Sequence, residues 1–148
     1  MTLRPVLAHD DDTEAVERFV SALQVATDAV AFNAAFAQDV LWGSPFGAVV
    51  EGYDDLHAIH AQMLTAPPPG VGDHEGSTYV TEHARRVTDD VALAFVRRLS
   101  SGGEPGEPMV GRPDAFDELA LFVLVRHDEA WWLAAALHTP DRREVYAQ

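Results

Sequence analysis

Two histidines are the side chains in this chain best suited to chemistry in a pocket, His60 and His138. Imidazole titrates near neutral pH, so a histidine can act as a general acid, a general base or a hydrogen-bond partner of a carbonyl group. His60 stands four residues from Leu56 and from Leu64 in a segment with helical spacing, which predicts that His60 points inward. The alternative is a core histidine bonded to a backbone carbonyl.

His138 lies on the last predicted strand, on one face with Trp132, Ala134 and Ala136 if the strand alternates regularly. Small residues beside a large polar side chain leave space for a ligand, which favours a position of His138 in the wall of a pocket. The alternative is a histidine at a strand end that reaches solvent.

A metal or nucleotide cofactor is not expected. Metal sites usually need a third protein ligand, and Asp39 and Ser44 are poorly spaced to join His60 and His138. No glycine-rich nucleotide motif follows a strand, so NAD, flavin and ATP binding have no support. The chain has no cysteine, which excludes thiol nucleophiles, thiolate metal sites and disulfides.

The passage WGSPFG, residues 42–47, is predicted to lie at the mouth of a pocket, where a turn over residues 44–47 follows the strand and Trp42, Ser44 and Phe46 shape the opening. Phe95 is a further candidate for the wall, although a core position is the alternative. If Phe95 lines the pocket, Arg97 shares its face and would meet an anionic or carbonyl-bearing ligand. The alternative for Arg97 is a surface arginine whose stem covers apolar surface.

The elements that would position these residues follow from hydrophobic periodicity. An apolar stripe predicts a first helix beginning near Thr13, and the later pattern changes to strands with tight turns. The expected helices are the first one, about 30–37, and about 53–65; the expected strands are 40–42, 77–87, 91–99, 118–126 and 131–138. Three helices followed by an antiparallel meander predict an α+β fold whose helices cover the concave face of a curved sheet and enclose a pocket.

We expect a single domain over residues 1–148, with a loose N-terminal arm at about 1–9 and a polar tail at about 140–148. The Gly/Pro-rich stretch 100–114 is predicted to be a long loop. Whether this loop acts as a lid is left open by the sequence.

The charge composition limits the kinds of binding partner that we expect. The chain has 24 acidic and 10 basic side chains, a formal net charge of −14. Such a charge repels phosphate backbones and anionic lipids, so neither nucleic acid nor a membrane surface is an expected partner. No stretch approaches the roughly 18 apolar residues of a membrane span. Without cysteines or a signal-peptide core, the expected location is the cytoplasm.

Three passages carry a resemblance to a known family: FAQDVLWGSPFG with Gly52 and His60, then RRVTDDVALAFVRR, then LALFVLVRHDEAWWLAAALHTP. In order and spacing they resemble the NTF2-like superfamily, in its SnoaL-like branch, and most of all the SgcJ/EcaC-type proteins of actinobacterial natural-product clusters. The resemblance covers about residues 14–140. It implies a cone of curved sheet and three helices, and often a homodimer through the outer sheet face, where we expect Val96 or Leu124 to be partly exposed.

Ketosteroid isomerase shares this fold, and its general base is a carboxylate just before the proline of the corresponding passage. Here that position is Ser44. The isomerase's oxyanion hole uses a tyrosine and a protonated aspartic acid, which align with Val20 and Val123. The isomerase mechanism is therefore not expected in this chain.

The resemblance and the two histidines together predict a cofactor-independent accessory or tailoring enzyme that acts on a hydrophobic polyketide or polyene intermediate. His60 and His138 would be its catalytic residues, and Trp42, Ser44, Phe46, Phe95 and Arg97 would contact the substrate. Two alternatives stay open: a noncatalytic protein that shelters such an intermediate, and a structural dimerisation domain.

Overall fold

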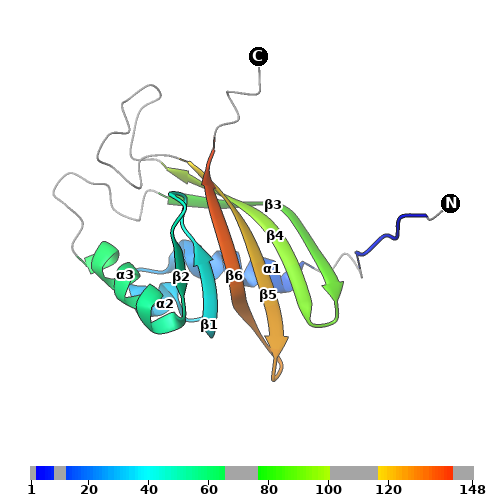
Figure 1. Cartoon of the computed structure of the whole chain (residues 1–148), viewed down its shortest axis with the longest axis horizontal. Coiled ribbons are helices and arrows are strands. Elements are labelled where there is room, and N and C mark those ends of the chain that lie inside the picture. Colours follow the sequence, from blue (N-terminus) through cyan, green and yellow to red (C-terminus); the bar gives the residue numbers. More distant parts are fainter. Residues whose placement is uncertain (1–2, 9–12, 66–76, 101–116, 142–148) are drawn as a thin grey trace, which may run out of the picture.

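The computed structural model describes residues 3–8, 13–65, 77–100 and 117–141 (Figure 1). Its elements, in chain order, are α1 Glu14–Val25, α2 Ala29–Phe32, β1 Phe36–Gly43, β2 Val49–Glu51, α3 Tyr53–Thr65, β3 Ser77–Thr88, β4 Val91–Ser100, β5 Glu118–His127 and β6 Ala130–Pro140. The predicted loop 100–114, beyond Ser100, and the predicted tail from residue 142 onward lie outside the described residues. Residues 3–8 are exposed and belong to no helix or strand.

The helix α1 forms because its apolar residues recur at helical spacing. Val16, Phe19, Val20 and Leu23 are all buried on one face, as the stripe in the sequence predicts. Acidic residues occupy the first turn, where the helix dipole favours negative charge. The prediction of α3 over residues 53–65 is confirmed as well.

The second helix is much shorter than predicted. The helix α2 is a single turn, capped by the Asp28 side chain, which accepts a hydrogen bond from the backbone N–H of Ala31 at 2.8 Å. The strand β1 then begins at Phe36, four residues before the predicted start at Val40. Apolar residues spaced by four lie on one face of a helix and also on one face of a strand, so the spacing does not distinguish the two.

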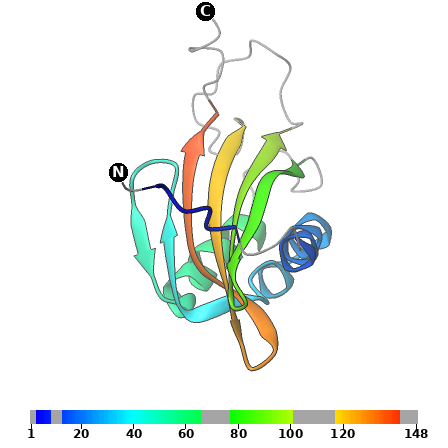
Figure 2. The ribbon, with the colours of Figure 1, turned by 90° about the vertical axis from the view of Figure 1, so that its right-hand side faces the viewer.

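The six strands form one sheet in the order β2-β1-β6-β5-β4-β3, in which only the β1–β6 pair is parallel. The meander from β3 to β6 is confirmed, whereas β2 was not predicted. The sheet is curved and unclosed, and the helices lie on its concave side (Figure 2). The β5–β6 hairpin turns at Asp128 and Glu129, which both have positive φ, the backbone of a tight turn between strands.

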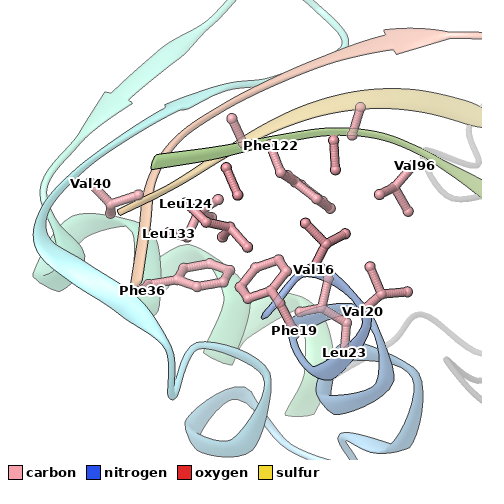
Figure 3. Packing of buried hydrophobic residues seen from close by; sticks show 14 of the residues in the cluster. Val16, Phe19, Val20, Leu23, Phe36, Val40, Val96, Phe122, Leu124 and Leu133 are labelled. Atoms are coloured by element: carbon pink, nitrogen blue, oxygen red, sulfur yellow. The ribbon is translucent and has the colours of Figure 1, made fainter. Parts of the chain in front are cut away.

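The hydrophobic core lies between α1 and the concave face of the sheet (Figure 3). Phe19 from α1 packs edge-on against Phe122 of β5, with ring centroids 5.3 Å apart. Val96 and Leu124 belong to this core and are each 1% exposed, so the prediction that they face outward is wrong. Each lies at an inward position of its strand, within the hydrophobic core.

A β-bulge in β6 changes which residues share the face of His138. Val123 pairs with Ala135 and Leu124 pairs with Leu133, so Ala134 is an extra residue without a partner on β5. The alternation reverses at such an insertion. Leu133, Ala136 and His138 are consequently the buried positions, and the prediction that Trp132 and Ala134 share the face of His138 is wrong.

Candidate functional site

A cavity of about 420 Å³ lies between the concave face of the sheet and the helices, a size typical of small-molecule sites. Most of its wall is apolar. The apolar lining residues are Leu23, Phe32, Trp42, Pro45, Phe46, Ala48, Val50, Leu56, Ile59, Val96, Ala120 and Phe122. The polar ones are Ser44, His60, Tyr79, Arg98, Glu118 and His138.

His60 enters the cavity wall from α3 and is 8% exposed. Its Nδ1 atom lies 2.7 Å from Oδ1 of Asn33, the fully buried residue that ends α2. The amide nitrogen of Asn33 lies 3.0 Å from Nδ1 of His57, which stacks on Tyr53 at a centroid distance of 5.3 Å. His57 is thus partly buried and joined to the site.

Both contacts of Asn33 are satisfied when its oxygen accepts from His60 and its nitrogen donates to His57. An amide oxygen only accepts hydrogen bonds, so Nδ1 of His60 carries the proton and Nε2 of the neutral ring is unprotonated. A buried side chain that holds a histidine in one tautomer is the usual way in which proteins prepare an imidazole for one role.

His138 enters the wall from β6 and is also 8% exposed. Its Nδ1 atom donates to the backbone carbonyl of Gly43 on the neighbouring strand β1, at 2.8 Å. Burial lowers the pKa of His138 below its ordinary value, although the hydrogen bond to Gly43 opposes this shift. The neutral ring, with Nε2 unprotonated, is therefore favoured near neutral pH.

Trp42 of β1 contacts both imidazoles. Its ring centroid is 5.0 Å from that of His60, in an edge-to-face arrangement, and 4.2 Å from that of His138. The two histidines, 78 residues apart in the sequence by the difference of their numbers, are thus brought together around one indole. Such aromatic contacts restrict the ring orientations of all three residues.

Ser44 and Phe46 both line the cavity, as predicted for the turn between β1 and β2. The Ser44 hydroxyl oxygen accepts hydrogen bonds from the backbone N–H groups of Phe46, at 3.2 Å, and Ala48, at 3.1 Å. Phe46 is largely exposed and lies at the edge of the cavity. The serine therefore organises the turn that holds Phe46 and Trp42 in the wall.

Phe95 and Arg97 do not line the cavity. Both lie on the outer face of β4, where Phe95 is 42% exposed and Arg97 bonds the carboxylates of Glu82 and Asp141. The hydrogen bond to Glu82 is the main cause that raises the pKa of Arg97. The inward positions of β4 are Ala92, Ala94 and Val96. Phe95 and Arg97 alternate with these residues and therefore point outward, so the prediction that they face the cavity is wrong.

Sequence reasoning missed three polar residues of the wall. Arg98 of β4 lies inward, and its Nε atom donates to Oε2 of Glu118 on β5 at 3.0 Å. Tyr79 of β3 stands directly opposite Arg98 in the sheet. The two alanines of β4 were the available signal, because small residues fit under a helix and imply that Arg98 continues their face.

Burial raises the pKa of Tyr79 to about 12, while Arg98 opposes the shift and Glu118 adds to it. The Tyr79 phenol accordingly keeps its proton near neutral pH and can donate a hydrogen bond. Glu118 is the one carboxylate among the described lining residues, and Arg98 holds it in an ion pair. Asp39 is exposed on β1, away from this cavity.

Within residues 3–8, 13–65, 77–100 and 117–141, no three His, Cys, Asp or Glu side chains are grouped so that they could hold a metal ion. In that same part of the chain, no helix has the length and apolar character needed to cross a membrane. The polar groups available in the described wall are two imidazoles, a phenol, the Ser44 hydroxyl and an ion pair.

No protein-family model matches this chain, and no curated protein matches it by sequence. Solved structures do match. A domain of unknown function with a cystatin-like fold from Nostoc punctiforme is 22% identical, with a TM-score of 0.66 over 91% of this chain and 82% of that one. An NTF2-like protein of unknown function from Shewanella oneidensis is 13% identical, with a TM-score of 0.64 over 86% of this chain and 98% of the other.

A ketosteroid isomerase-like protein from Erwinia carotovora atroseptica is 15% identical, with a TM-score of 0.57 over 85% of this chain and 90% of that chain. At these identities the likeness establishes the fold alone. The α+β architecture predicted from the sequence is thereby confirmed, and the fold is NTF2-like.

Proposed function

We propose that this protein binds a mainly apolar small molecule in its cavity and that His60 and His138 interact there with the ligand's polar groups. One observation carries the proposal: a cavity of about 420 Å³ with an apolar wall has two buried imidazoles in contact with one indole. Apolar pockets with a few convergent polar groups are the common form of ligand sites.

The catalytic form of this proposal is a cofactor-independent acid/base enzyme. Each imidazole is held through Nδ1 by a fixed acceptor, Asn33 for His60 and Gly43 for His138. Nε2 of a neutral ring held in this way is a base, and the same atom donates a proton once the ring is charged. Two such groups in an apolar wall can move a proton between two positions of a bound carbonyl compound.

The finer assignment is an accessory or tailoring enzyme for polyketide or polyene intermediates, in the SnoaL-like branch and close to the SgcJ/EcaC-type proteins. It rests on the sequence resemblance, and the apolar wall is compatible with it. Trp42, Ser44 and Phe46 would contact the ligand in this proposal, because they line the cavity. Phe95 and Arg97 are not part of this proposed site, because neither residue lines the cavity.

The second candidate is a noncatalytic protein that shelters a reactive intermediate. Two features favour it: Ser44 occupies the position of the isomerase base, and the Glu118 carboxylate is held by Arg98. A purely structural dimerisation domain is disfavoured, because side chains do not fill the space between sheet and helices.

A homodimer through the outer sheet face is part of the proposal. The outer face leaves apolar side chains in water, among them Leu41, Val80, Phe95 and Leu137 with exposed fractions of 48%, 45%, 42% and 61%. Exposed apolar patches on a sheet commonly mark an interface. Analytical ultracentrifugation should show a dimer that Phe95→Lys converts to a monomer; a monomer in the unmodified protein would contradict this part.

Binding is tested with the dye Nile red, whose fluorescence rises in apolar surroundings. We expect saturable binding that Ile59→Trp weakens by about tenfold, because Ile59 lines the cavity and a larger side chain reduces its volume. Val30→Trp is the matched control, since Val30 is exposed on α2 and does not line the cavity. Equal effects of both substitutions would contradict binding in the cavity.

Catalysis is tested in a reconstituted polyketide or polyene pathway that supplies the intermediate named in the proposal. Product formation should fall by at least about 100-fold in His60→Ala and in His138→Ala, since general acid–base groups contribute rate factors of roughly that size. Nile red should still bind both variants. Unchanged product formation in both variants would remove the catalytic roles, and ligand binding without turnover would favour the sheltering protein.

A further inference from the structure

Three polar side chains of the cavity wall form a row across one end of the sheet. Tyr79, Arg98 and Glu118 occupy directly opposed positions of β3, β4 and β5. His138 lies on β6 beside this row, opposite Ala120, which is two residues along β5 from Glu118. The four residues come from the start of β3, the end of β4, the start of β5 and the end of β6, which lie at the same end of the sheet (Figure 2).

This row differs from the rest of the cavity because the remaining wall is apolar, apart from Ser44 and His60 at the β1–β2 turn and α3. The side chains of Arg98 and Glu118 are only 13% and 14% exposed. Their ion pair therefore lies in a region of low dielectric, where an isolated charge would be strongly disfavoured.

The row offers hydrogen-bonding groups but no net charge. The positive charge of Arg98 is matched by the carboxylate of Glu118 at 3.0 Å. Burial keeps the phenol of Tyr79 protonated and favours the neutral form of His138. The formal charge of −14 carried by the whole chain is thus not reproduced at this end of the cavity.

From this arrangement we infer that the ligand is an uncharged amphipathic molecule whose apolar body fills the cavity and whose polar end group binds at Tyr79, Arg98 and Glu118. This inference rests on the function proposed above and defines its ligand class. The end group carries both a donor and an acceptor, as a carboxamide does, because the row presents the donors of Arg98 and Tyr79 beside the acceptor of Glu118.

A charged end group is disfavoured for a physical reason. A carboxylate in the cavity would compete with Glu118 for Arg98 and bring a second negative charge close to the first. A cationic group would compete with Arg98 for Glu118 in the same way. In either case one charge would remain buried without compensation, which costs far more than a missing neutral hydrogen bond.

Four probes with the same apolar body test this inference: 2-naphthamide, 2-naphthoate, 2-naphthamidine and 2-methylnaphthalene. Affinities are measured by calorimetry at neutral pH and physiological salt, which screens the charge of the distant surface. We expect the amide to bind about tenfold or more tightly than each of the other three. If the negative electrostatic potential of the whole acidic chain determined the affinity instead, the cationic amidine would bind most tightly. That result would overturn the inference.

Glu118→Gln supplies the second measurement. It removes the carboxylate that Arg98 bonds, so the affinity of naphthoate relative to naphthamide should rise by about tenfold or more. Glu82→Gln is the matched control, because it removes the same formal charge from an ion pair of Arg97 on the outer face. The ratio should stay within about twofold in this control, a change of less than ~0.5 kcal/mol. An unchanged ratio in Glu118→Gln would overturn the inference.

Should Glu118→Gln fail to fold, the double substitution Arg98→Met with Glu118→Met replaces the pair by apolar side chains, a change that buried ion pairs often tolerate. It should abolish the preference for naphthamide over 2-methylnaphthalene. Equal binding of all four probes to the unmodified protein would overturn the polar end-group site while leaving the apolar cavity as the binding site. Absence of binding by every probe would contradict both the inference and the proposed function.

Discussion

Asn33 caps the C-terminal end of α2 and His60 lies on α3, yet Oδ1 of Asn33 lies 2.7 Å from Nδ1 of His60 and both side chains are buried. The backbone of Asn33 is anchored as well, since its N–H donates to the carbonyl of Ala29 at 2.9 Å. Through its amide nitrogen Asn33 also bonds His57. The tautomer of a pocket histidine is thus set by a residue that does not line the cavity.

Asn33→Ala should lower the free energy of unfolding by about 2 kcal/mol, because two histidines lose a buried hydrogen-bond partner. Chemical denaturation measures the change. Gln38→Ala, at an exposed position of β1, should stay within about 0.5 kcal/mol. Nitrogen-15 spectra should show one tautomer of His60 in the unmodified protein and a mixture in the variant. A single tautomer in both would contradict the role given to Asn33.

His138 should make the folded state less stable in mild acid. Its pKa is lowered in the folded protein from 6.5, so below about pH 6.5 the unfolded chain binds a proton that the folded chain does not. Stability is then lost as the pH falls from that value towards the folded pKa. Urea denaturation at pH 7.5 and pH 5.5 should show a smaller loss in His138→Asn than in the unmodified protein. Equal losses would show that another group is responsible.

Tyr79 should resist ionisation, because burial raises its pKa to about 12 from an ordinary value of 10.0. Between these values the unfolded chain loses the phenolic proton while the folded chain keeps it. Stability should therefore fall as the pH rises above about 10, and less so in Tyr79→Phe. Titration by phenolate absorbance should show a late-ionising tyrosine that this substitution removes. Its persistence in the variant would assign it to another tyrosine.

Ser44→Ala should lower the free energy of unfolding by about 1 kcal/mol, because the N–H groups of Phe46 and Ala48 lose their acceptor. Ser44→Thr keeps the hydroxyl and should retain most of that stability. Ser21→Ala, at an exposed position of α1, serves as the control and should have little effect. If thermal unfolding is the same for Ser44→Ala and the unmodified protein, the hydroxyl does not hold the turn.

The local periodicity of apolar residues was sufficient to predict much of the fold. The spacing of Val16, Phe19, Val20 and Leu23 specifies α1, and the strand pattern with short polar turns specifies the meander of β3 to β6. Such elements depend on neighbours within a few residues. For the same reason the inward position of His60 could be predicted from its own helix.

Register and face were decided by the tertiary structure. The extra residue Ala134 shifts β6 by one position, and the burial of Ala92 and Ala94 in the core fixes the face of β4 that brings Arg98 inward in place of Arg97. A shift of one residue exchanges the two faces of a strand, yet it barely changes the hydrophobic pattern when both faces are largely apolar.

What the sequence by itself determined was the α+β fold, the turn at residues 44–47 beside the cavity and the inward positions of His60 and His138. What only the tertiary structure decided was their surroundings: Asn33 behind His60, Gly43 behind His138 and the ion pair of Arg98 with Glu118. These contacts join residues 20 to 95 positions apart by the difference of their numbers. Hydrophobic periodicity reports only on near neighbours, so it carries no record of such contacts.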